Sequence, residues 1–356
     1  MQQPLAHNAH ILFILPPTFS HVAQFFLFAA QLRQFSPQCT IDIWLEKPHW
    51  LRDSITKQQH QLATTWLANN MYVSHLYALP ASNKKFLNNL AAATNKQYSA
   101  IVPLMPLRPL QCARLAKKIN KHATIIGFFS KPTFSFLAQQ VKKLVNSYNI
   151  IADTPFMVQH YKNQCSHILP HATSRENTKQ FILKSIPRGW ICYAKLRFLK
   201  WNIEKKSNIF GQVIALDLHT SAWKNRWSPK KILELITFLK KQDPWNDTSF
   251  IVFCPTKKIR HFSKYFGSWP ESKIFLCSPT ANVFQLPAIT HLCDIIISAH
   301  DGGTGLYANL FQIPTITLHK RNVYTQNDIF QTIKKTKNRD DLFVTIAKNV
   351  AELLKK

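Results

Sequence analysis

The chain has 356 residues, which is long for a single core and indicates two domains of ordinary size. Its 46% apolar and 17% charged residues are typical of folded proteins and exclude a largely disordered chain. The 45 Lys and Arg against 17 Asp and Glu give a net charge of +28, which indicates a negatively charged partner, or a Lys-rich surface without one.

In the first half, apolar runs typical of buried strands alternate with segments of helical periodicity. The first ten residues lack the positive start of a signal peptide, and no apolar run reaches transmembrane length. We expect strands at His10–Leu15, Thr40–Leu45, Tyr98–Leu104 and Thr124–Phe128, and helices at Val22–Phe35, Leu110–Lys118 and, less regularly, Pro132–Ile168.

The alternation resumes after the charged segment Glu204–Lys206, and Ser228 or Pro229 marks a helix start. The expected strands are Val213–Leu218, Phe250–Cys254, Lys273–Leu276, Asp294–Ser298 and Thr315–Leu318. The expected helices are Pro229–Lys240, Val283–Leu292, Leu306–Phe311 and one or two in Asn327–Lys356.

This order of elements predicts the α/β fold class, with two Rossmann-like domains facing across a cleft where a ligand binds. The expected parts are an amino-terminal domain at 1–183, a basic connector at 184–207, a carboxyl-terminal domain at 208–325 and terminal helices at 326–356.

Seven scattered cysteines without a CxxC pair indicate neither a disulfide framework nor a zinc ribbon, and favour a reducing, cytoplasmic compartment. The histidines lack the close spacing of a metal site. We therefore predict no metal and no cofactor.

Three of the seven glycines, Gly302, Gly303 and Gly305, directly follow the strongest predicted strand of the second half. Glycines between a strand and a helix let backbone N–H groups approach an anion, and the helix start adds positive dipole. Thr304 adds a hydroxyl donor, whereas Asp301 suits a ligand hydroxyl or amine, or the local backbone. A tight turn that binds no ligand is the alternative.

A second polar loop follows the first strand of the second half. Thr220 and Ser221 provide hydroxyls, and Lys224 and Arg226 provide positive charge, which together suit a diphosphate. In a parallel sheet this loop and the glycine loop open at the same edge. The alternative is an exposed basic turn whose tryptophans cover the core.

Together the two loops resemble glycosyltransferase family nine, the lipopolysaccharide heptosyltransferases. The likeness runs from Val213 to Leu318 and rests on Lys224–Pro229, Cys293–Gly303 and Ala308–Thr315. It implies the GT-B fold and an inverting, metal-independent transfer of a heptose-like sugar from a nucleotide-diphosphate sugar to a lipopolysaccharide core or another lipid-linked saccharide. The implied donor-binding residues are Thr220, Ser221, Lys224, Arg226, Asp301, Gly302, Gly303, Thr304 and Gly305, with Lys224 also stabilising the leaving diphosphate.

The sequence departs from the family pattern at several positions. Gly302 replaces the Ser or Thr after the aspartate, Leu306 replaces the motif histidine, and Pro255–Lys258 lacks the acid for the nucleotide ribose. The family's proposed catalytic aspartate falls at His21, which we predict as the base because histidine titrates near neutral pH. Capping of the following helix is an alternative role for His21. A member that keeps the fold without catalysis also remains open.

The segment 184–206 carries seven Lys and Arg, one Glu and four aromatic residues. This composition favours an anionic membrane surface, and thus a peripheral location on the inner face of the inner membrane. Binding of single-stranded nucleic acid and a solvated linker are alternatives. A basic nucleic-acid-binding protein is the competing function, but no zinc-finger, RRM-like or KH-like motif indicates a specific nucleic-acid partner.

Overall fold

The computed structural model divides the chain into two compact units, Met1–Pro187 and Arg188–Lys356. Each unit contains a six-stranded sheet in which all neighbouring strands are parallel. The structure describes residues 8–16, 36–46, 54–78, 82–104, 109–130, 135–151, 184–205, 211–218, 227–242, 245–266, 273–278, 285–299, 304–319, 330–334 and 339–354, and helical positions between 22 and 33.

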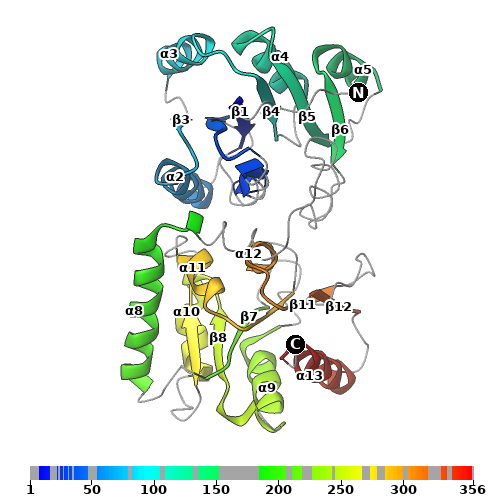
Figure 1. Cartoon of the computed structure of the whole chain (residues 1–356). Coiled ribbons are helices and arrows are strands. Elements are labelled where there is room, and N and C mark those ends of the chain that lie inside the picture. Colours follow the sequence, from blue (N-terminus) through cyan, green and yellow to red (C-terminus); the bar gives the residue numbers. More distant parts are fainter. Residues whose placement is uncertain are drawn as a thin grey trace. The chain divides into compact units, whose positions relative to one another are not determined.

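The sheet of the amino-terminal unit has the order β3-β2-β1-β4-β5-β6, so the chain begins near the middle and builds outward to both edges (Figure 1). Its strands are β1 (His10–Leu15), β2 (Thr40–Leu45), β3 (His75–Tyr77), β4 (Ala100–Pro103), β5 (Thr124–Ser130) and β6 (Ser147–Ile151). Its labelled helices are α2 (Ser54–Ala68), α3 (Asn83–Thr94), α4 (Pro109–Ile119) and α5 (Ser135–Leu144).

Helices cover both faces of this sheet because its strands are apolar on both sides. On one face, buried residues of β1, β2, β4 and β5 pack against α3, α4 and α5. On the other face, Phe13 of β1 contacts Phe25, and Phe26 contacts Trp66 of α2. The described positions between 22 and 33 are helical, as predicted for Val22–Phe35.

The sheet of the carboxyl-terminal unit has the order β12-β11-β10-β7-β8-β9. Its strands are β7 (Val213–Asp217), β8 (Ser249–Phe253), β9 (Ile274–Cys277), β10 (Ile295–Ser298), β11 (Thr315–His319) and β12 (Phe330–Lys334). Its α-helices are α8 (Arg188–Lys205), α9 (Pro229–Lys240), α10 (Ile259–Phe266), α11 (Gln285–His291), α12 (Thr304–Phe311) and α13 (Arg339–Leu354), and 3-10 turns lie at Trp245–Asp247 (η2) and Thr256–Lys258 (η3).

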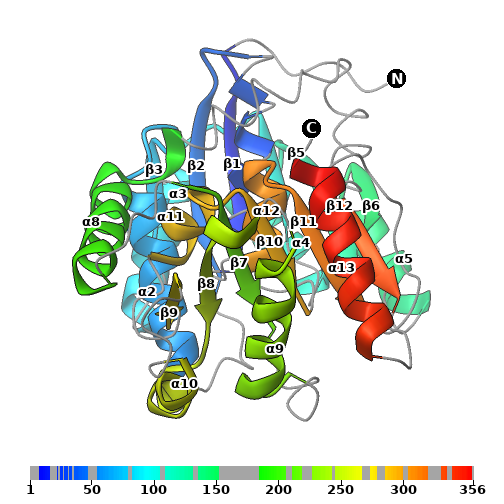
Figure 2. The ribbon, with the colours of Figure 1, turned by 90° about the horizontal axis from the view of Figure 1, so that it is seen from below.

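Helices also cover both faces of the second sheet (Figures 1 and 2). One face packs against α9, α10 and α13 through a core that includes Ile214, Phe250 and Ile297. On the other face, α12 contacts β10 and β11, α11 contacts α12, and α8 contacts α11. The prediction of two Rossmann-like α/β domains is therefore confirmed.

Two predicted helical segments contain strands instead. Ser147–Ile151 (β6), within Pro132–Ile168, and Phe330–Lys334 (β12), within Asn327–Lys356, each pair with one neighbouring strand at an edge of their sheet. The basic segment expected to join the domains contains the 18-residue helix α8.

Candidate functional site

The loops that follow β7 and β10 leave the second sheet side by side. The two strands are parallel neighbours, and their last residues, Asp217 and Ser298, lie opposite each other in register. The backbone N–H of Ala299 donates to the carbonyl of Asp217 over 3.0 Å. The carboxyl edge of a parallel sheet is where open α/β domains bind ligands. Both loops predicted to hold the donor therefore start at that edge.

Most of the predicted site residues lie outside the described residues. These are His21, Thr220, Ser221, Lys224, Arg226, Asp301, Gly302 and Gly303. Thr304 and Gly305 are described, and they form the first turn of α12. The position of α12 directly after the glycine loop agrees with the predicted strand, glycine loop and helix order.

Thr304 links the two loops. Its side chain is buried, and its hydroxyl donates a hydrogen bond to Oδ2 of Asp217. The Asp217 carboxylate therefore lies at the amino terminus of α12, where free N–H groups and the helix dipole stabilise negative charge. The hydroxyl that we expected to bind diphosphate directly thus holds a carboxylate in this structure. Asp217 was not among the predicted site residues, although an acid that ends a buried strand was a usable signal.

The helix α12 is firmly anchored below this contact. Tyr307, Ala308 and Phe311 are buried, and the rings of Tyr307 and Phe311 stack with centroids 6.1 Å apart. Burial raises the pKa of the Tyr307 hydroxyl well above its ordinary value. After the last turn, Gln312 adopts a left-handed φ of 57°, and the N–H of Ile313 donates to the carbonyl of Ala308. This is a Schellman end, which fixes where the helix stops.

The neighbouring strand ends carry hydroxyl groups. Oγ1 of Thr256, after β8, lies 2.6 Å from Oγ of Ser278, after β9. The segment Pro255–Lys258, which follows β8, contains no acidic residue.

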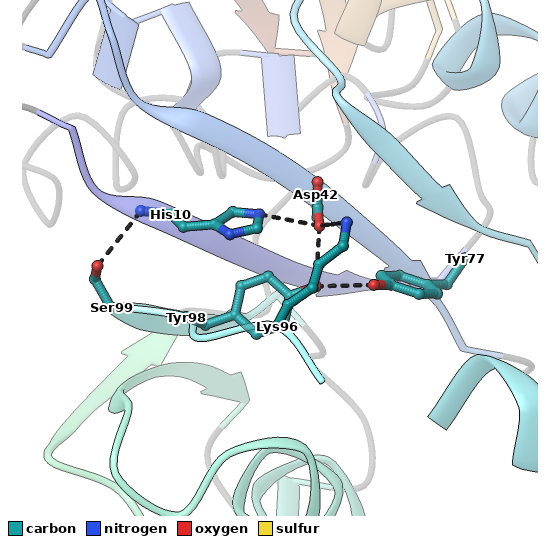
Figure 3. Close-up of polar contacts among 6 residues, drawn as sticks. All are labelled: His10, Asp42, Tyr77, Lys96, Tyr98 and Ser99. Carbon is teal, nitrogen blue, oxygen red and sulfur yellow. Dashed lines mark hydrogen bonds and ion pairs between the residues drawn. The ribbon is translucent and has the colours of Figure 1, made fainter. Parts of the chain in front are cut away.

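A second polar cluster lies in the amino-terminal unit, around the fully buried Asp42 of β2 (Figure 3). Its Oδ2 accepts hydrogen bonds from Nζ of Lys96 at 2.7 Å and from the hydroxyl of Tyr98 at 2.9 Å. Nε2 of His10 lies 3.1 Å from the same oxygen, and the hydroxyl of Tyr98 lies 3.0 Å from that of Tyr77. Among the described residues, no group donates a hydrogen bond to Oδ1 of Asp42.

This cluster lies away from the ligand-binding edge. His10 opens β1, Asp42 is the third residue of β2, and Lys96 and Tyr98 precede β4. The backbone N–H of Ser99 donates to the carbonyl of His10, which joins the starts of β1 and β4. The cluster therefore stabilises the amino-terminal ends of the central strands rather than binding substrate.

The same cluster shifts two pKa values. Partial burial lowers the pKa of Lys96, but the hydrogen bond and charge of Asp42 raise it by more, so the pKa ends above its ordinary value. Burial, the hydrogen bond with Tyr77 and the charge of Asp42 raise the pKa of Tyr98 far above its usual range.

The described part of the chain shows neither a metal site nor a membrane span. There, no three His, Cys, Asp or Glu side chains gather closely enough to hold a metal ion. None of the helices given above is both long and apolar enough to cross a bilayer.

Comparison with solved structures identifies the fold. A family nine glycosyltransferase from Veillonella parvula superposes with a TM-score of 0.60 at 13% identity, over 96% of this chain and 89% of that one. The chain has the fold of the heptosyltransferases. The Escherichia coli heptosyltransferase WaaC, with ADP-2-deoxy-2-fluoro heptose, gives 0.60 at 12% identity over 96% and 99% of the two chains.

A third similar structure, the E. coli ADP-heptose heptosyltransferase II, gives a TM-score of 0.57 at 14% identity over 97% and 99% of the two chains. No family model and no curated protein sequence matches this chain. The predicted likeness to family nine glycosyltransferases is thus confirmed at the level of the GT-B fold.

Proposed function

We propose that this protein is a glycosyltransferase of the heptosyltransferase type. It moves a heptose-like sugar from a nucleotide-diphosphate sugar to a lipopolysaccharide core or a related lipid-linked saccharide, with inversion and without a metal. The main support is the adjacency of the β7 and β10 loops at the carboxyl edge of a sheet in a GT-B fold. WaaC structures with ADP and with an ADP-heptose analogue favour ADP as the nucleotide.

In this proposal the carboxyl-terminal unit binds the donor. Lys224 and Arg226 neutralise the diphosphate, and the hydroxyls of Thr220 and Ser221 donate to it. Backbone N–H groups of the glycine loop, residues 302–305, add donors that stabilise the leaving group. Asp301 accepts a hydrogen bond from a sugar hydroxyl.

Asp217 and Thr304 act as positioning residues in this site. Their hydrogen bond ties the first turn of α12 to the end of β7, so the glycine loop between β10 and α12 is held at both ends. Thr304→Val removes the hydroxyl and should raise the donor KM about tenfold, whereas Thr304→Ser should restore it, because a lost hydrogen bond to a charged group costs about 1.5–3 kcal/mol. A loss in both variants would point to simple packing damage.

The amino-terminal unit binds the acceptor in this proposal, and His21 takes the proton of the attacking hydroxyl. In the sequence, His21 lies between β1, which ends at Leu15, and the helical positions that begin at Val22. His21→Ala should abolish transfer and keep donor binding. Unchanged turnover would remove His21 from the mechanism.

Calorimetry with ADP, and a thermal-shift screen with ADP-, GDP-, UDP- and CDP-linked sugars, test donor binding directly. Lys224→Ala should weaken binding at least tenfold, while Lys230→Ala, an exposed lysine at the start of α9, should leave it unchanged. Equal affinities for the two variants would contradict the donor site.

The same assays separate the competing functions. Donor binding without sugar transfer or donor hydrolysis would identify a member that has lost catalysis. Absence of donor binding, with gel shifts that persist at physiological salt, would identify a nucleic-acid-binding protein instead, because non-specific phosphate contacts weaken as salt rises.

A further inference from the structure

The helix α8 lies on the outside of the carboxyl-terminal unit and is held along one side only. Ala194 and Trp201 are buried, and α8 contacts α11. The ring of Trp201 stacks on Phe275 of β9 with centroids 5.4 Å apart, and the Arg197 guanidinium lies over the Trp201 ring at 5.2 Å. The opposite side of the helix therefore faces solvent.

The solvent side of α8 is apolar along its centre. Leu196 is 62% exposed, Leu199 is 47% exposed and Tyr193 is 43% exposed. The three residues follow one another at a spacing of three, so they form one stripe along the helix. By helical geometry Leu196 lies opposite the buried Ala194 and Trp201. Single exposed leucines are common on protein surfaces, but three large apolar side chains together on one exposed helix face indicate an interaction surface.

Cations flank this stripe on both sides. Arg188, Lys195 and Lys200 are exposed, with Lys195 and Arg188 on one flank and Lys200 on the other. The only acid in α8 is Glu204, in its last turn. A stripe of leucines with long basic side chains beside it is the pattern of a helix that lies in the plane of a bilayer, with its cations reaching the headgroups.

The orientation of the aromatic residues corrects part of the sequence interpretation. We expected four aromatics of the segment 184–206 at the interface, but Trp201 is buried and Trp190 and Phe198 are half-buried. Single-stranded nucleic acid needs outward rings on which bases stack, and Tyr193 is the only exposed aromatic among these four. The outward leucines favour lipid.

We propose that the α8 face formed by Arg188, Tyr193, Lys195, Leu196, Leu199 and Lys200 is a docking surface for anionic lipid headgroups. Positive charge on the helix and on the whole chain, +28, complements an anionic leaflet. The same charge opposes a second copy of this chain on the same face. The inference rests on the proposed function, since a lipid-linked acceptor brings the enzyme to a membrane, but lipid binding itself requires no activity.

Co-sedimentation of the full chain with vesicles tests the docking surface. Wild-type protein should bind phosphatidylglycerol-containing vesicles reversibly, bind phosphatidylcholine vesicles poorly, and lose binding as salt rises. Each cation near an anionic surface strengthens binding roughly fivefold, so Lys195→Glu with Lys200→Glu should weaken it at least a hundredfold. The matched pair Lys142→Glu with Lys143→Glu, exposed on α5, makes the same change in net charge and should weaken binding less than tenfold.

The apolar contribution needs its own variants. Leu196→Ser with Leu199→Ser should weaken binding at least tenfold, whereas Leu87→Ser with Val344→Ser, which are 57% and 55% exposed elsewhere, should not. Circular dichroism checks that each variant is folded. Equal losses in the α8 pairs and their controls, or no binding of wild-type protein to anionic vesicles, would overturn the proposal.

A measurement on protein that keeps the native α8 sequence guards against misfolded variants. Cys192 is exposed on α8, next to the stripe. An environment-sensitive dye attached there, in a Cys165→Ser background, should shift to the blue on anionic vesicles and not on phosphatidylcholine. An unchanged spectrum with bound vesicles would place the contact elsewhere. Calorimetry with ADP in the absence of lipid should give wild-type affinity for the α8 variants, so loss of lipid binding and failure of the proposed function are distinguishable.

Discussion

Replacement of Lys96 tests whether the cluster around Asp42 stabilises the amino-terminal unit. Asp42 is fully buried, and Lys96, which is 34% exposed, is its cationic partner. Lys96→Met leaves a buried carboxylate with the Tyr98 hydroxyl and His10 as neighbours. Loss of one partner of a fully buried pair costs about 3–5 kcal/mol, and solvent at Lys96 reduces this, so we expect about 2 kcal/mol.

Asp42→Asn should cost less, about 1 kcal/mol, because it removes the buried charge and lets the Lys96 ammonium turn toward water. The double variant should then be more stable than the sum of the two single losses predicts, because, unlike Lys96→Met alone, it leaves no unpaired buried charge. Lys96→Met should therefore lower the stability of the unit more than Asp42→Asn does. This order is expected only if the main destabilising term is burial of the unpaired carboxylate.

Hydrogen exchange followed by mass spectrometry is the suitable assay, because a two-unit chain need not unfold in one step. Protection should fall in peptides of β1, β2 and β4 and stay unchanged in the carboxyl-terminal unit, which serves as an internal control. Lys84→Met, an exposed lysine on α3, makes the same chemical change without an aspartate partner. The reasoning is refuted if Lys96→Met and Lys84→Met lower protection equally.

The pH dependence of the Lys96 effect has a defined sign. The pKa of Lys96 is raised in the folded protein above its ordinary 10.5. A raised pKa of a cation contributes stability in full below the unfolded value, and that contribution is lost as pH rises through the folded value. The difference between wild type and Lys96→Met should therefore be constant at neutral pH and shrink above pH 10.5.

Three further predictions concern the carboxyl-terminal unit. Trp201→Ala should cost about 3–5 kcal/mol and release α8, measured by hydrogen exchange, whereas Leu196→Ala on the exposed side should cost little. Burial raises the pKa of Cys254 and Cys277 from 9.0 to about 12, so wild type should lose roughly 2 kcal/mol per thiol between pH 9 and about 11, and replacement of both by alanine should flatten that slope in urea titrations. Gln312→Gly should raise stability by about 0.5–1 kcal/mol, because glycine accepts a left-handed φ without cost, and Gln312→Ala should not.

The central strands could be predicted from sequence because they are buried on both faces. His10–Leu15 has the predicted bounds, and Val213–Asp217 and Ile295–Ser298 begin or end within a residue of the predicted ones. Such strands are continuous apolar runs, which few other elements produce.

The edge strands were harder to predict. Ser147–Ile151 and Phe330–Lys334 mix polar and apolar residues, since an edge strand pairs on one side only and needs less apolar surface. His75–Tyr77, the edge strand β3, is only three residues long and gave no recognisable pattern. Local sequence therefore marked the middle of each sheet better than its margins.

The candidate site was predictable in part for a similar reason. A glycine-rich turn after a buried strand is a local signal, and it predicted a helix at Leu306–Phe311, whereas α12 begins two residues earlier, at Thr304. The contact of Thr304 with Asp217 is not local, because it joins residues 87 positions apart. The sequence contains both residues, but only the pairing of β7 with β10 brings them together.

In the amino-terminal unit, the residues that stabilise the sheet and the residues predicted to act on substrate lie at opposite ends of the same strands. The contacts of Asp42 hold the strands at their beginnings, whereas the loop that contains the predicted base His21 follows the carboxyl end of β1 in the sequence. Substitutions in such a loop can accumulate without loosening the sheet beneath it. A scaffold of this kind can change its substrate while keeping its architecture, which is consistent with a shared fold at 12–14% identity.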